Sequence, residues 1–413
     1  MNDTFDLGIS KEQLGCTQSQ RISALEGHLL YNYLLRLSFN EIQDEIKIEY
    51  ILGTSNIQSL SFERPSYNYD VQLQSYTATD RINICKLLYN DSEYFLTISK
   101  YSKGDEHHGI AQVVFDISIY NYKVIDKKID IIQLLLIKSK QHSVFAKKIL
   151  RLHTDLLSNL QVLDCVEIIE PKNVLLDDIY IPKLKKEQCE RFIKAVKNYE
   201  KERCVLRYLF NGAPGTAKTQ LINAIMNELN GTVNFFVMGG AEISLTEVFN
   251  FVRQFEKCVL VIDDLDLVVG NRDNRTNYKD MAVFLSTLDG HLPNSLFLLA
   301  STNDKKLVDL AASRPGRFDM ILDIDAIDND NYMSLIKRET DDDEILSFFN
   351  TNILEMFLAR KVTGAYIVSF IKQLKNLKYT NGILTSEDFN NYLNLTYNGF
   401  YKSNSDNLKA VGF

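Results

Sequence analysis

The sequence predicts an α/β protein in which a parallel sheet covered by helices lies between an α+β region and an all-helical region. Three observations support this class. Helix-like segments alternate with short apolar runs between about residues 184 and 325, which is typical of a parallel sheet. Several short strand-like runs precede this part, and apolar residues recur at helical spacing after it, from 331 to 394. A chain of 413 residues is long for one domain, so we expect domains at 1–170, 171–330 and 331–395 and a tail at 396–413.

Composition limits the classes of function. Apolar residues make up 45% of the chain and charged residues 24%, so a sizeable core can form. The net charge of −8 argues against a nucleic-acid or anionic-membrane partner, which would need a basic surface. The six cysteines include no CxxC pair, which indicates reduced thiols and a cytoplasmic location. We expect no signal peptide and no membrane span, because the longest apolar stretch, Ile131–Ile137, is far shorter than the roughly 20 residues of a membrane helix.

The first region carries elements but no chemical motif. Arg21–Leu37 has the strongest helical pattern, and Ser23 or Thr17 is placed near its start as a capping residue. Ile129–Leu163 is expected to be mostly helical. Strand-like runs separated by turn-rich clusters are expected at Glu45–Leu52, Asn83–Leu88, Glu93–Ser99 and Ile110–Ile119.

The central region contains a strand, a glycine-containing loop and a helix in direct succession. The run Tyr208–Asn211 leads into Gly212-Ala-Pro-Gly215-Thr-Ala-Lys218-Thr219, and a helical pattern follows. This is the layout of a phosphate-binding P-loop, in which backbone N–H groups and a helix N-terminus surround phosphates. Lys218 adds a charge for the β- and γ-phosphates, and the Thr219 hydroxyl is placed to ligate Mg²⁺. The expected nucleotide-binding residues here are Gly212, Ala213, Pro214, Gly215, Thr216, Ala217, Lys218, Thr219 and Gln220.

One position departs from the usual P-loop pattern. Ala217 stands where glycine normally precedes the lysine, and its β-carbon would crowd the loop if the backbone were left-handed. Taken alone, such a variant loop could also be an ordinary turn between a strand and a helix.

A second segment supports the nucleotide-site interpretation. The apolar run Cys258–Ile262 ends in two carboxylates, and a buried parallel strand would deliver them to the sheet edge beside the P-loop. Asp263 is then placed to hold the Mg²⁺ shell, and Asp264 to polarise the attacking water. A buried strand with a polar turn is common by itself, but two such segments in this order and spacing favour a nucleotide triphosphatase.

Two further segments fit the same site. The run Ser295–Thr302 ends at Asn303, whose amide could hydrogen-bond the lytic water or the γ-phosphate. Arg314 and Arg317 bracket a Pro-Gly turn. In a ring of subunits they would reach the neighbour's nucleotide and stabilise transition-state charge. The alternative for this turn is a surface loop with one structural salt bridge, and the segment taken alone favours that alternative.

Four motifs in this order, GAPGTAKT, VLVIDD, LASTN and SRPGRFD, resemble the AAA family of ATPases within the AAA+ class. Asp289-Gly290 is similar to a further family motif, and the resemblance covers about residues 172–395. It implies a P-loop NTPase sheet with a helical lid domain, ATP and Mg²⁺ as ligands, and a ring that usually has six subunits. By position it implies adenine contacts at Asp178 and Ile179, lid contacts to nucleotide at Gly364 and Ala365, metal contacts at Thr219 and Asp263, and catalytic roles for Asp264, Asn303, Arg314 and Arg317.

The chain departs from the family in two ways that affect mechanism. Asp264 replaces a glutamate and is one methylene shorter, and a misplacement of about 1 Å can cost on the order of 100-fold in rate, so we expect slow hydrolysis. The loop Gly239–Ser244, at the place of the substrate-gripping loop, is short and has no aromatic residue. In this it resembles the mitochondrial AAA translocase of the folded Rieske iron–sulfur protein.

These observations lead to one preferred function and two alternatives. The preferred one is an ATP-driven ring that remodels or translocates a protein substrate without threading it, with the 1–170 domain recognising the substrate. The first alternative is a DNA-transaction AAA+ ATPase of the clamp-loader or helicase-loader kind. The second is a nucleotide-gated assembly scaffold with little turnover, which the short Asp264 side chain favours.

Overall fold

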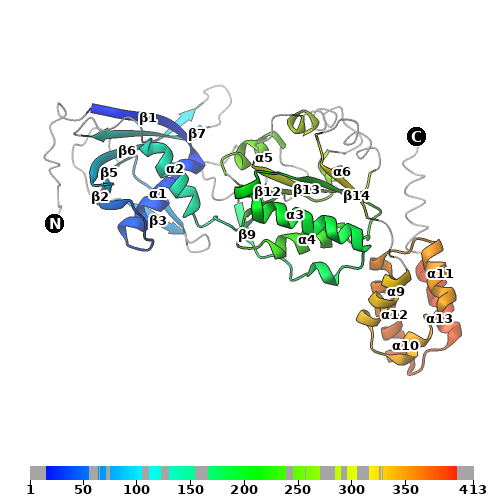
Figure 1. Ribbon diagram of the computed structural model, residues 1–413. Coiled ribbons are helices and arrows are strands. Elements are labelled where there is room, and N and C mark those ends of the chain that lie inside the picture. Colours follow the sequence, from blue (N-terminus) through cyan, green and yellow to red (C-terminus); the bar gives the residue numbers. More distant parts are fainter. Residues whose placement is uncertain are drawn as a thin grey trace. The chain divides into compact units, whose positions relative to one another are not determined.

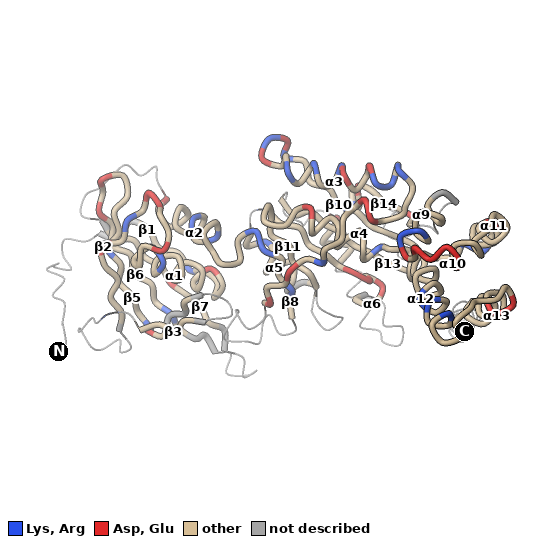
Figure 2. The backbone as a smooth tube through the Cα atoms, turned by 90° about the horizontal axis from the view of Figure 1, so that it is seen from below, with Lys and Arg blue, Asp and Glu red and all other residues tan. Residues whose placement is uncertain are grey.

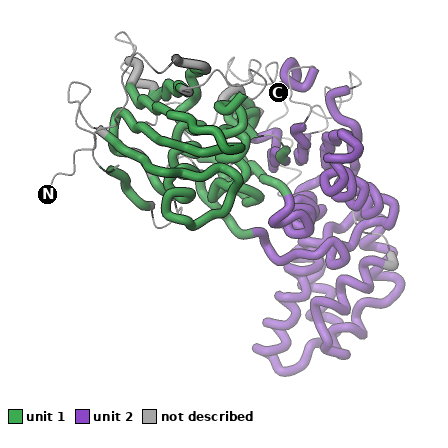
Figure 3. The backbone as a smooth tube through the Cα atoms, turned by 60° about the vertical axis from the view of Figure 1, so that its left-hand side comes forward, with its two compact units in different colours: residues 1–170, 233–258 green, residues 171–232, 259–413 purple. Residues whose placement is uncertain are grey.

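The structure is a computed structural model. It describes residues 15–54, 64, 66–70, 75–104, 111–121, 130–153, 166–238, 245–255, 257–269, 284–289, 295–304, 316–324, 327 and 329–397. The chain forms two compact units, coloured separately in Figure 3. The first contains residues 1–170 and 233–258, and the second contains residues 171–232 and 259–413.

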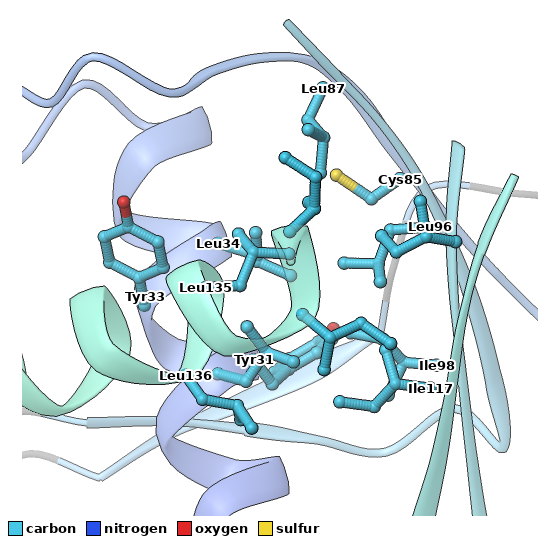
Figure 4. Close-up of a cluster of buried hydrophobic side chains, with 14 of the residues drawn as sticks. Tyr31, Tyr33, Leu34, Cys85, Leu87, Leu96, Ile98, Ile117, Leu135 and Leu136 are labelled. Carbon is cyan, nitrogen blue, oxygen red and sulfur yellow. The ribbon is translucent and has the colours of Figure 1, made fainter. Parts of the chain in front are cut away.

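An antiparallel five-stranded sheet and two helices make up most of the first unit. The sheet order is β1 (Gly15–Ser23), β7 (Ala111–Asn121), β6 (Ser92–Gly104), β5 (Ile82–Tyr89) and β2 (Lys47–Thr54). The helices α1 (Ala24–Ser38) and α2 (Ile131–Gln141) pack against it, and Figure 4 shows Leu34 and Leu135 from these helices pointing toward Leu96 and Ile117 of the sheet. A two-stranded sheet, β3 (Tyr67–Asp70) and β4 (Ser75–Ala78), belongs to the same unit. The strand-like runs expected in this region are therefore confirmed.

The start of α1 shows how the sequence sets an element boundary. The Ser23 hydroxyl accepts a hydrogen bond from the Glu26 backbone N–H at 3.3 Å, and the Glu26 carboxylate accepts one from the Ser23 N–H at 3.3 Å. This is a capping box, which satisfies two backbone donors at the helix start. Ser23 is thus confirmed as the cap, and the helix begins at Ala24 rather than at Arg21 because Arg21 lies in β1, opposite Asp116 of β7.

The expectation of mostly helix through Ile129–Leu163 is wrong for residues 142–153. After α2 the chain forms the strand β8 (Ile149–Leu152), and residues 154–165 lie outside the described part. Most of β8 is buried, and a short buried apolar run cannot be assigned to helix or strand by periodicity alone. β8 lies between β9 (Val166–Ile169), its antiparallel neighbour, and β11 (Asn234–Met238), its parallel neighbour.

The pairing of β11 with β8 bears on the expected domain boundary at residue 170. Phe235 and Phe236 lie opposite Ile149 and Leu150 in register. Residues 233–258, which include β11 and α5 (Leu245–Val252), therefore cluster with the first 170 residues, although we expected them within a 171–330 domain.

The second unit contains the strand–helix alternation that the sequence predicts. Its strands follow the order β14 (Met320–Asp323), β10 (Arg207–Asn211), β13 (Leu296–Thr302) and β12 (Cys258–Ile262), and β10 is parallel to both of its neighbours. Every residue of β12 and β13 is buried, which is the pattern of strands covered on both faces. The helices α3 (Lys183–Glu202) and α4 (Lys218–Glu228) lie side by side (Figure 1). Charges of both signs are spread along α3 in Figure 2.

In the described part of the second unit after residue 328, five helices form a bundle where the sequence has helical periodicity. The core of the bundle includes Tyr332, Phe357 and Phe370, and its helices are visible in Figure 1. The acidic run 341–344 starts a helix, because the Asp342 carboxylate accepts hydrogen bonds from the N–H groups of Glu344 and Ile345. The helices are α9 (Asn329–Glu339), α10 (Asp343–Ser347), α11 (Thr351–Ala359), α12 (Gly364–Asn381) and α13 (Ser386–Tyr397). Across the described residues, none of the helices combines the length and the apolar character needed to cross a bilayer.

Candidate nucleotide-binding site

A cavity of about 680 Å³ lies in the second unit where the predicted motifs meet. Its wall combines the loop after β10, the ends of β12 and β13, the segment before α3, and the helices α9 and α12. The expected site residues that line it are Asp178, Ile179, Pro214, Gly215, Thr216, Ala217, Lys218, Thr219, Gln220, Asp264, Asn303, Gly364 and Ala365. The expected residues Gly212, Ala213 and Asp263 lie next to these residues in the chain but not in the wall.

Two glycines give the loop after β10 its shape. A β-carbon on Gly212 would lie 2.2 Å from the backbone oxygen of Ile324, which no side chain could accept. Gly215 has a φ of +82°, and a β-carbon there would lie 3.0 Å from the Ala365 methyl group. The Ala365 N–H also donates to the Gly215 carbonyl at 3.4 Å. The loop therefore needs glycine at both positions, and at the second it contacts the first turn of α12.

Ala217 adopts the conformation that makes its side chain costly. Its φ is +75° and its ψ is 17°, which is left-handed backbone immediately before α4. Such a conformation costs an L-residue other than glycine roughly 1–2 kcal/mol. The left-handed backbone considered from the sequence is thus present, and the Ala217 carbonyl accepts the first hydrogen bond of the helix, from Leu221 at 2.9 Å.

Lys218 is held over the loop by three oxygen atoms. Its ammonium group donates to the carbonyls of Gly212 and Ala213 at 2.8 and 3.0 Å and to the Asn303 side-chain oxygen at 2.7 Å. The residue is only 6% exposed. Burial lowers the pKa of Lys218, and the nearby carboxylates, of which Asp264 has the largest effect, oppose this. The side chain is therefore a positioned cation at the cavity.

The two carboxylates after β12 are held by residues at the end of β13. The Ser301 hydroxyl donates to Asp263 at 2.5 Å and accepts from the Asp264 N–H at 2.8 Å. The Asn303 amide nitrogen donates to the Asp264 carboxylate at 3.2 Å. Asn303 thus connects Lys218 to Asp264 through the two ends of one amide group. We did not expect a role for Ser301, although its place in the apolar run, two residues before Asn303, was a visible signal.

The surroundings of Asp264 shift the pKa of its carboxyl group. Burial raises its pKa, the neighbouring carboxylates of Asp263 and Asp266 raise it further, and the Asn303 hydrogen bond and Lys218 act in the opposite direction. A carboxylate with a raised pKa is a stronger proton acceptor than an ordinary surface aspartate. Asp264 also has left-handed backbone, with a φ of +54°. This group is suited to orienting a water molecule and polarising its O–H bond.

Asp266 is a further site residue that the sequence interpretation missed. Its carboxylate accepts hydrogen bonds from the Thr302 hydroxyl at 3.1 Å and from the Asn303 N–H at 3.0 Å. It lies in the first turn of α6 (Leu265–Val269) and fixes the backbone that carries the Asn303 amide. The sequence contained a signal for this role, because Asp266 is a third acidic residue close to the two carboxylates that follow the strand.

The rest of the cavity wall, which comes from the segment before α3, from Ile327 and from the helices α9 and α12, was only partly expected. Ile179 is buried there, and Asp178, the residue before it, also lines the wall. The spacing of the unexpected α12 residues, three, four and seven positions after Ala365, was a signal that they share a helix face. The unexpected wall residues are Tyr180, Ile327, Leu335, Arg338, Val368, Ser369 and Lys372.

Of the two arginines expected to act on a neighbour's nucleotide, Arg317 forms an ion pair within the chain. Its guanidinium donates to both oxygens of Asp289, at 2.8 and 2.9 Å, and the residue is only 6% exposed. The pair raises the pKa of Arg317 and accounts for the Asp289 that the sequence motif singled out. Arg314 lies outside the described residues.

The donor chemistry of the site fits a magnesium nucleotide. The glycine positions and the turn into α4 form a loop that a β-carbon on Gly212 would obstruct. Thr219 offers a hydroxyl at this loop, and Asp263 offers a carboxylate at the strand end beside it. Hard oxygen donors in small number suit Mg²⁺, which keeps several waters and shares its coordination with phosphates.

These features define a P-loop nucleotide-binding site on a parallel sheet. Residues 208–326 match the model of the AAA family, the ATPase family associated with various cellular activities, so this segment is an AAA-type ATPase domain.

Curated relatives share this segment. The proteasome-activating nucleotidase of Methanococcus vannielii is 30% identical over 199 residues, which are 44% of this chain and 48% of the relative. The ATPase family gene 2 protein of Saccharomyces cerevisiae is 30% identical over 144 residues, 32% of this chain and 18% of the relative. The peroxisomal ATPase PEX6 of Kluyveromyces lactis is 35% identical over 139 residues, 30% of this chain and 14% of the relative. The chain thus spans about half, or less, of the length of the relatives it matches.

Proposed function

We propose that this protein binds ATP with Mg²⁺, hydrolyses it to ADP and phosphate, and uses the reaction to remodel or translocate a protein substrate as a ring of identical subunits. The observation that carries the proposal is the Asn303 amide, which contacts Lys218 at 2.7 Å and Asp264 at 3.2 Å on the cavity wall. Through this amide, the ammonium group that we propose binds phosphate is connected to the carboxylate that we propose activates water.

Each side chain has a definite task in this mechanism. Lys218 and the N–H groups of the loop bind the phosphates, and Thr219 and Asp263 supply oxygen ligands to Mg²⁺. The metal, when bound, neutralises charge on the phosphate oxygens. Asp264 orients the water, and Asn303 adjusts the position of Asp264 relative to the γ-phosphate through its amide. Arg314, supplied by the neighbouring subunit, completes the charge stabilisation.

Support for a protein substrate comes from the relatives and from charge. Two of the relatives are named for the proteasome and the peroxisome, which suggests protein handling at the level of the family. The net charge of −8 disfavours the DNA-transaction alternative. The non-threading mode rests on the short loop Gly239–Ser244, which lies outside the described residues, and on its likeness to the Rieske-protein translocase. A cytoplasmic location is in keeping with the free cysteines Cys85, Cys189, Cys204 and Cys258.

The test of the nucleotide function is Lys218→Ala with Lys197→Ala as its control. Lys197 is an exposed lysine of the same unit that pairs with Glu228 of α4 and does not line the cavity. The wild type and the control should bind ATP with Mg²⁺ and release phosphate, whereas Lys218→Ala should lose most of the binding measured by calorimetry. Unchanged binding and phosphate release in Lys218→Ala would contradict the proposal.

The scaffold alternative remains a second candidate, because Asp264 is shorter than the glutamate of the family. In that case nucleotide binding drives assembly and turnover is slow. The two candidates share one binding site and differ in rate, so they are separated by the Asp264 variant described in the Discussion.

A further inference from the structure

The segment Val174–Tyr180 forms one side of the cavity and is held by three different helices. It contains the short 3₁₀ helix Leu176–Asp178 and contributes Asp178, Ile179 and Tyr180 to the wall. The Asn227 amide of α4 donates to the Val174 carbonyl at 3.2 Å, and the Lys186 ammonium of α3 donates to the Asp177 carbonyl at 3.3 Å. These contacts fix the beginning and the middle of the segment on the helices that pack beside the sheet.

Arg338 of α9 holds the end of the segment. Its guanidinium donates to the Asp178 carbonyl at 2.7 Å and lies over the Tyr180 ring, with its central carbon 5.1 Å from the ring centre. Two of its nitrogens also donate to the Glu339 carboxylate, at 3.0 and 2.7 Å. One planar group therefore joins α9 to two residues of the segment, with its orientation set by a carboxylate on its own helix.

This arrangement uses properties that only arginine has. A guanidinium is planar and carries several donors in a fixed fork, so it can stack on a ring and bind a carbonyl at the same time. A lysine keeps the charge but has neither the plane nor the fork. Most of the contacts lie at the cavity wall, since Asp178, Tyr180 and Arg338 all line it. An arginine that formed only a surface salt bridge to Glu339 would need neither the hydrogen bond to the Asp178 carbonyl nor the stacking on Tyr180.

The position of Arg338 relative to the phosphate loop indicates which part of a ligand it affects. The phosphates belong at Lys218 and the loop, and the wall formed by Ile179, Tyr180 and Leu335 is the apolar part of the same cavity. An aromatic base is the part of a nucleotide that fits an apolar slot with backbone polar groups at its edge. The width of that slot depends on how closely Asp178–Tyr180 approaches α9.

We propose that Arg338 is a positioning residue for the base end of the nucleotide site, and that it sets selectivity for adenine by holding Asp178–Tyr180 against α9. The inference rests on the proposed nucleotide function and adds to it a determinant of base recognition. It also means that binding of the base and the placement of the first helix of the bundle are coupled through one side chain.

The test compares Arg338→Lys with the matched control Arg360→Lys. Arg360 belongs to the same helical bundle and also stacks on a tyrosine, Tyr397, at 4.7 Å, but it does not line the cavity. Dissociation constants are measured by calorimetry for ATP, GTP and inorganic tripolyphosphate in the presence of Mg²⁺. Arg338→Lys should weaken ATP binding roughly tenfold, as expected for loss of a charged hydrogen bond, and reduce the preference for ATP over GTP. Tripolyphosphate binding should stay at the wild-type value.

A second pair of variants tests the stacked ring without changing any charge. Tyr180→Leu removes the ring beneath the guanidinium, and Tyr180→Phe keeps it. Tyr180→Leu should show the same selective loss of ATP affinity to a smaller extent, and Tyr180→Phe, which keeps the ring, should lose less ATP affinity than Tyr180→Leu. Melting curves confirm that each variant is folded.

The outcomes separate this inference from the function on which it rests. If the wild type bound neither ATP nor tripolyphosphate, the proposed function would fail and this inference with it. If the wild type bound ATP and Arg338→Lys had the same affinities and the same ATP preference as Arg360→Lys, only the inference would be overturned. Equal weakening of ATP and tripolyphosphate by Arg338→Lys would also overturn it, because that pattern belongs to a general structural role.

Discussion

Ala217 holds left-handed backbone immediately before the helix that carries Lys218, with a φ of +75°. Glycine adopts this conformation without the steric cost that the alanine β-carbon incurs. We therefore expect Ala217→Gly to stabilise the second unit, because it removes about 1 kcal/mol of steric cost. The backbone entropy that glycine loses on folding reduces this gain. The measurement is urea unfolding followed by circular dichroism.

Ala224 provides an internal control for this prediction. It lies in the middle of α4, seven residues further on, and is buried in regular helix. Glycine in a helix interior costs about 1 kcal/mol relative to alanine, and a lost buried methyl group adds to that cost. The two identical substitutions should thus have opposite signs. Equal destabilisation by both would show that the left-handed backbone at Ala217 carries no strain.

Asp264 determines which of the two proposed functions applies. Its carboxylate accepts from Asn303 at 3.2 Å, and the glutamate of the AAA family would reach one methylene further. We expect Asp264→Glu to raise the rate of phosphate release by tenfold or more, since a displacement of about 1 Å can change a rate on the order of 100-fold. ATP affinity should not change. The assay is steady-state phosphate release at saturating ATP.

Two controls limit the interpretation of that result. Asp264→Asn should abolish hydrolysis and keep binding, because an amide cannot accept a proton from water. Asp266→Glu should lower the rate, because the Asp266 carboxylate fixes the backbone of Asn303. A longer side chain at this position would not bring a carboxylate closer to the lytic water. A rate for Asp264→Glu at or below that of the wild type would mean that the site geometry is already adapted to aspartate. The short side chain would then no longer argue for the scaffold alternative.

The elements show where sequence patterns suffice and where they do not. The helices of the bundle and the strands β10, β12 and β13 follow from periodicity, because each has a buried face or is buried throughout. β8 does not, since Ile149–Leu152 is a short apolar run whose partner, β11, is more than 80 residues away in the chain. The site shows the same division. The P-loop and the acids after β12 are local motifs, whereas Ser301, Asp266 and Arg338 act through contacts between segments that are distant in sequence.

An ion pair between elements of the first unit predicts how this unit responds to acid. Asp44, after α1, accepts a hydrogen bond from Lys138 of α2 at 3.1 Å, and only 2% of the Asp44 side chain is exposed. Burial raises the pKa of Asp44, but the Lys138 hydrogen bond and the N–H groups of Glu45 and Ile46 outweigh it and hold the pKa below the ordinary value of 3.8. Because the folded pKa is the lower one, the pair stabilises the unit above the unfolded pKa and this contribution is lost as pH falls through the folded pKa.

The variant Asp44→Asn tests this sign. At pH 7 it should lower the free energy of unfolding by about 2 kcal/mol, because a buried charged hydrogen bond is lost. At a pH below the folded pKa of Asp44, which itself lies below 3.8, the wild type and the variant should converge, since the carboxyl group is then protonated in both the folded and the unfolded wild type. Asp116→Asn is the control, because its ion pair with Arg21 is exposed on both sides and should matter little at either pH. Urea unfolding at the two pH values measures the difference, and a constant difference would contradict the assignment.

At the scale of the whole molecule, the proposal needs subunits that share an active site. Arg317 is paired with Asp289 inside its own chain, so we test the prediction on Arg314, the other arginine that the sequence assigns to a neighbour's site. A subunit with Lys218→Ala should lose most of its ATP binding but still offer Arg314, and a subunit with Arg314→Ala should bind ATP but lack the arginine. Each variant alone should therefore be inactive. Mixed rings should regain phosphate release wherever an Arg314→Ala site faces a Lys218→Ala subunit, because that interface has both Lys218 and Arg314.

The control mixes each single variant with the double variant, which has neither Lys218 nor Arg314. Rings that form from the two single variants and remain inactive would show that Arg314 does not act between subunits.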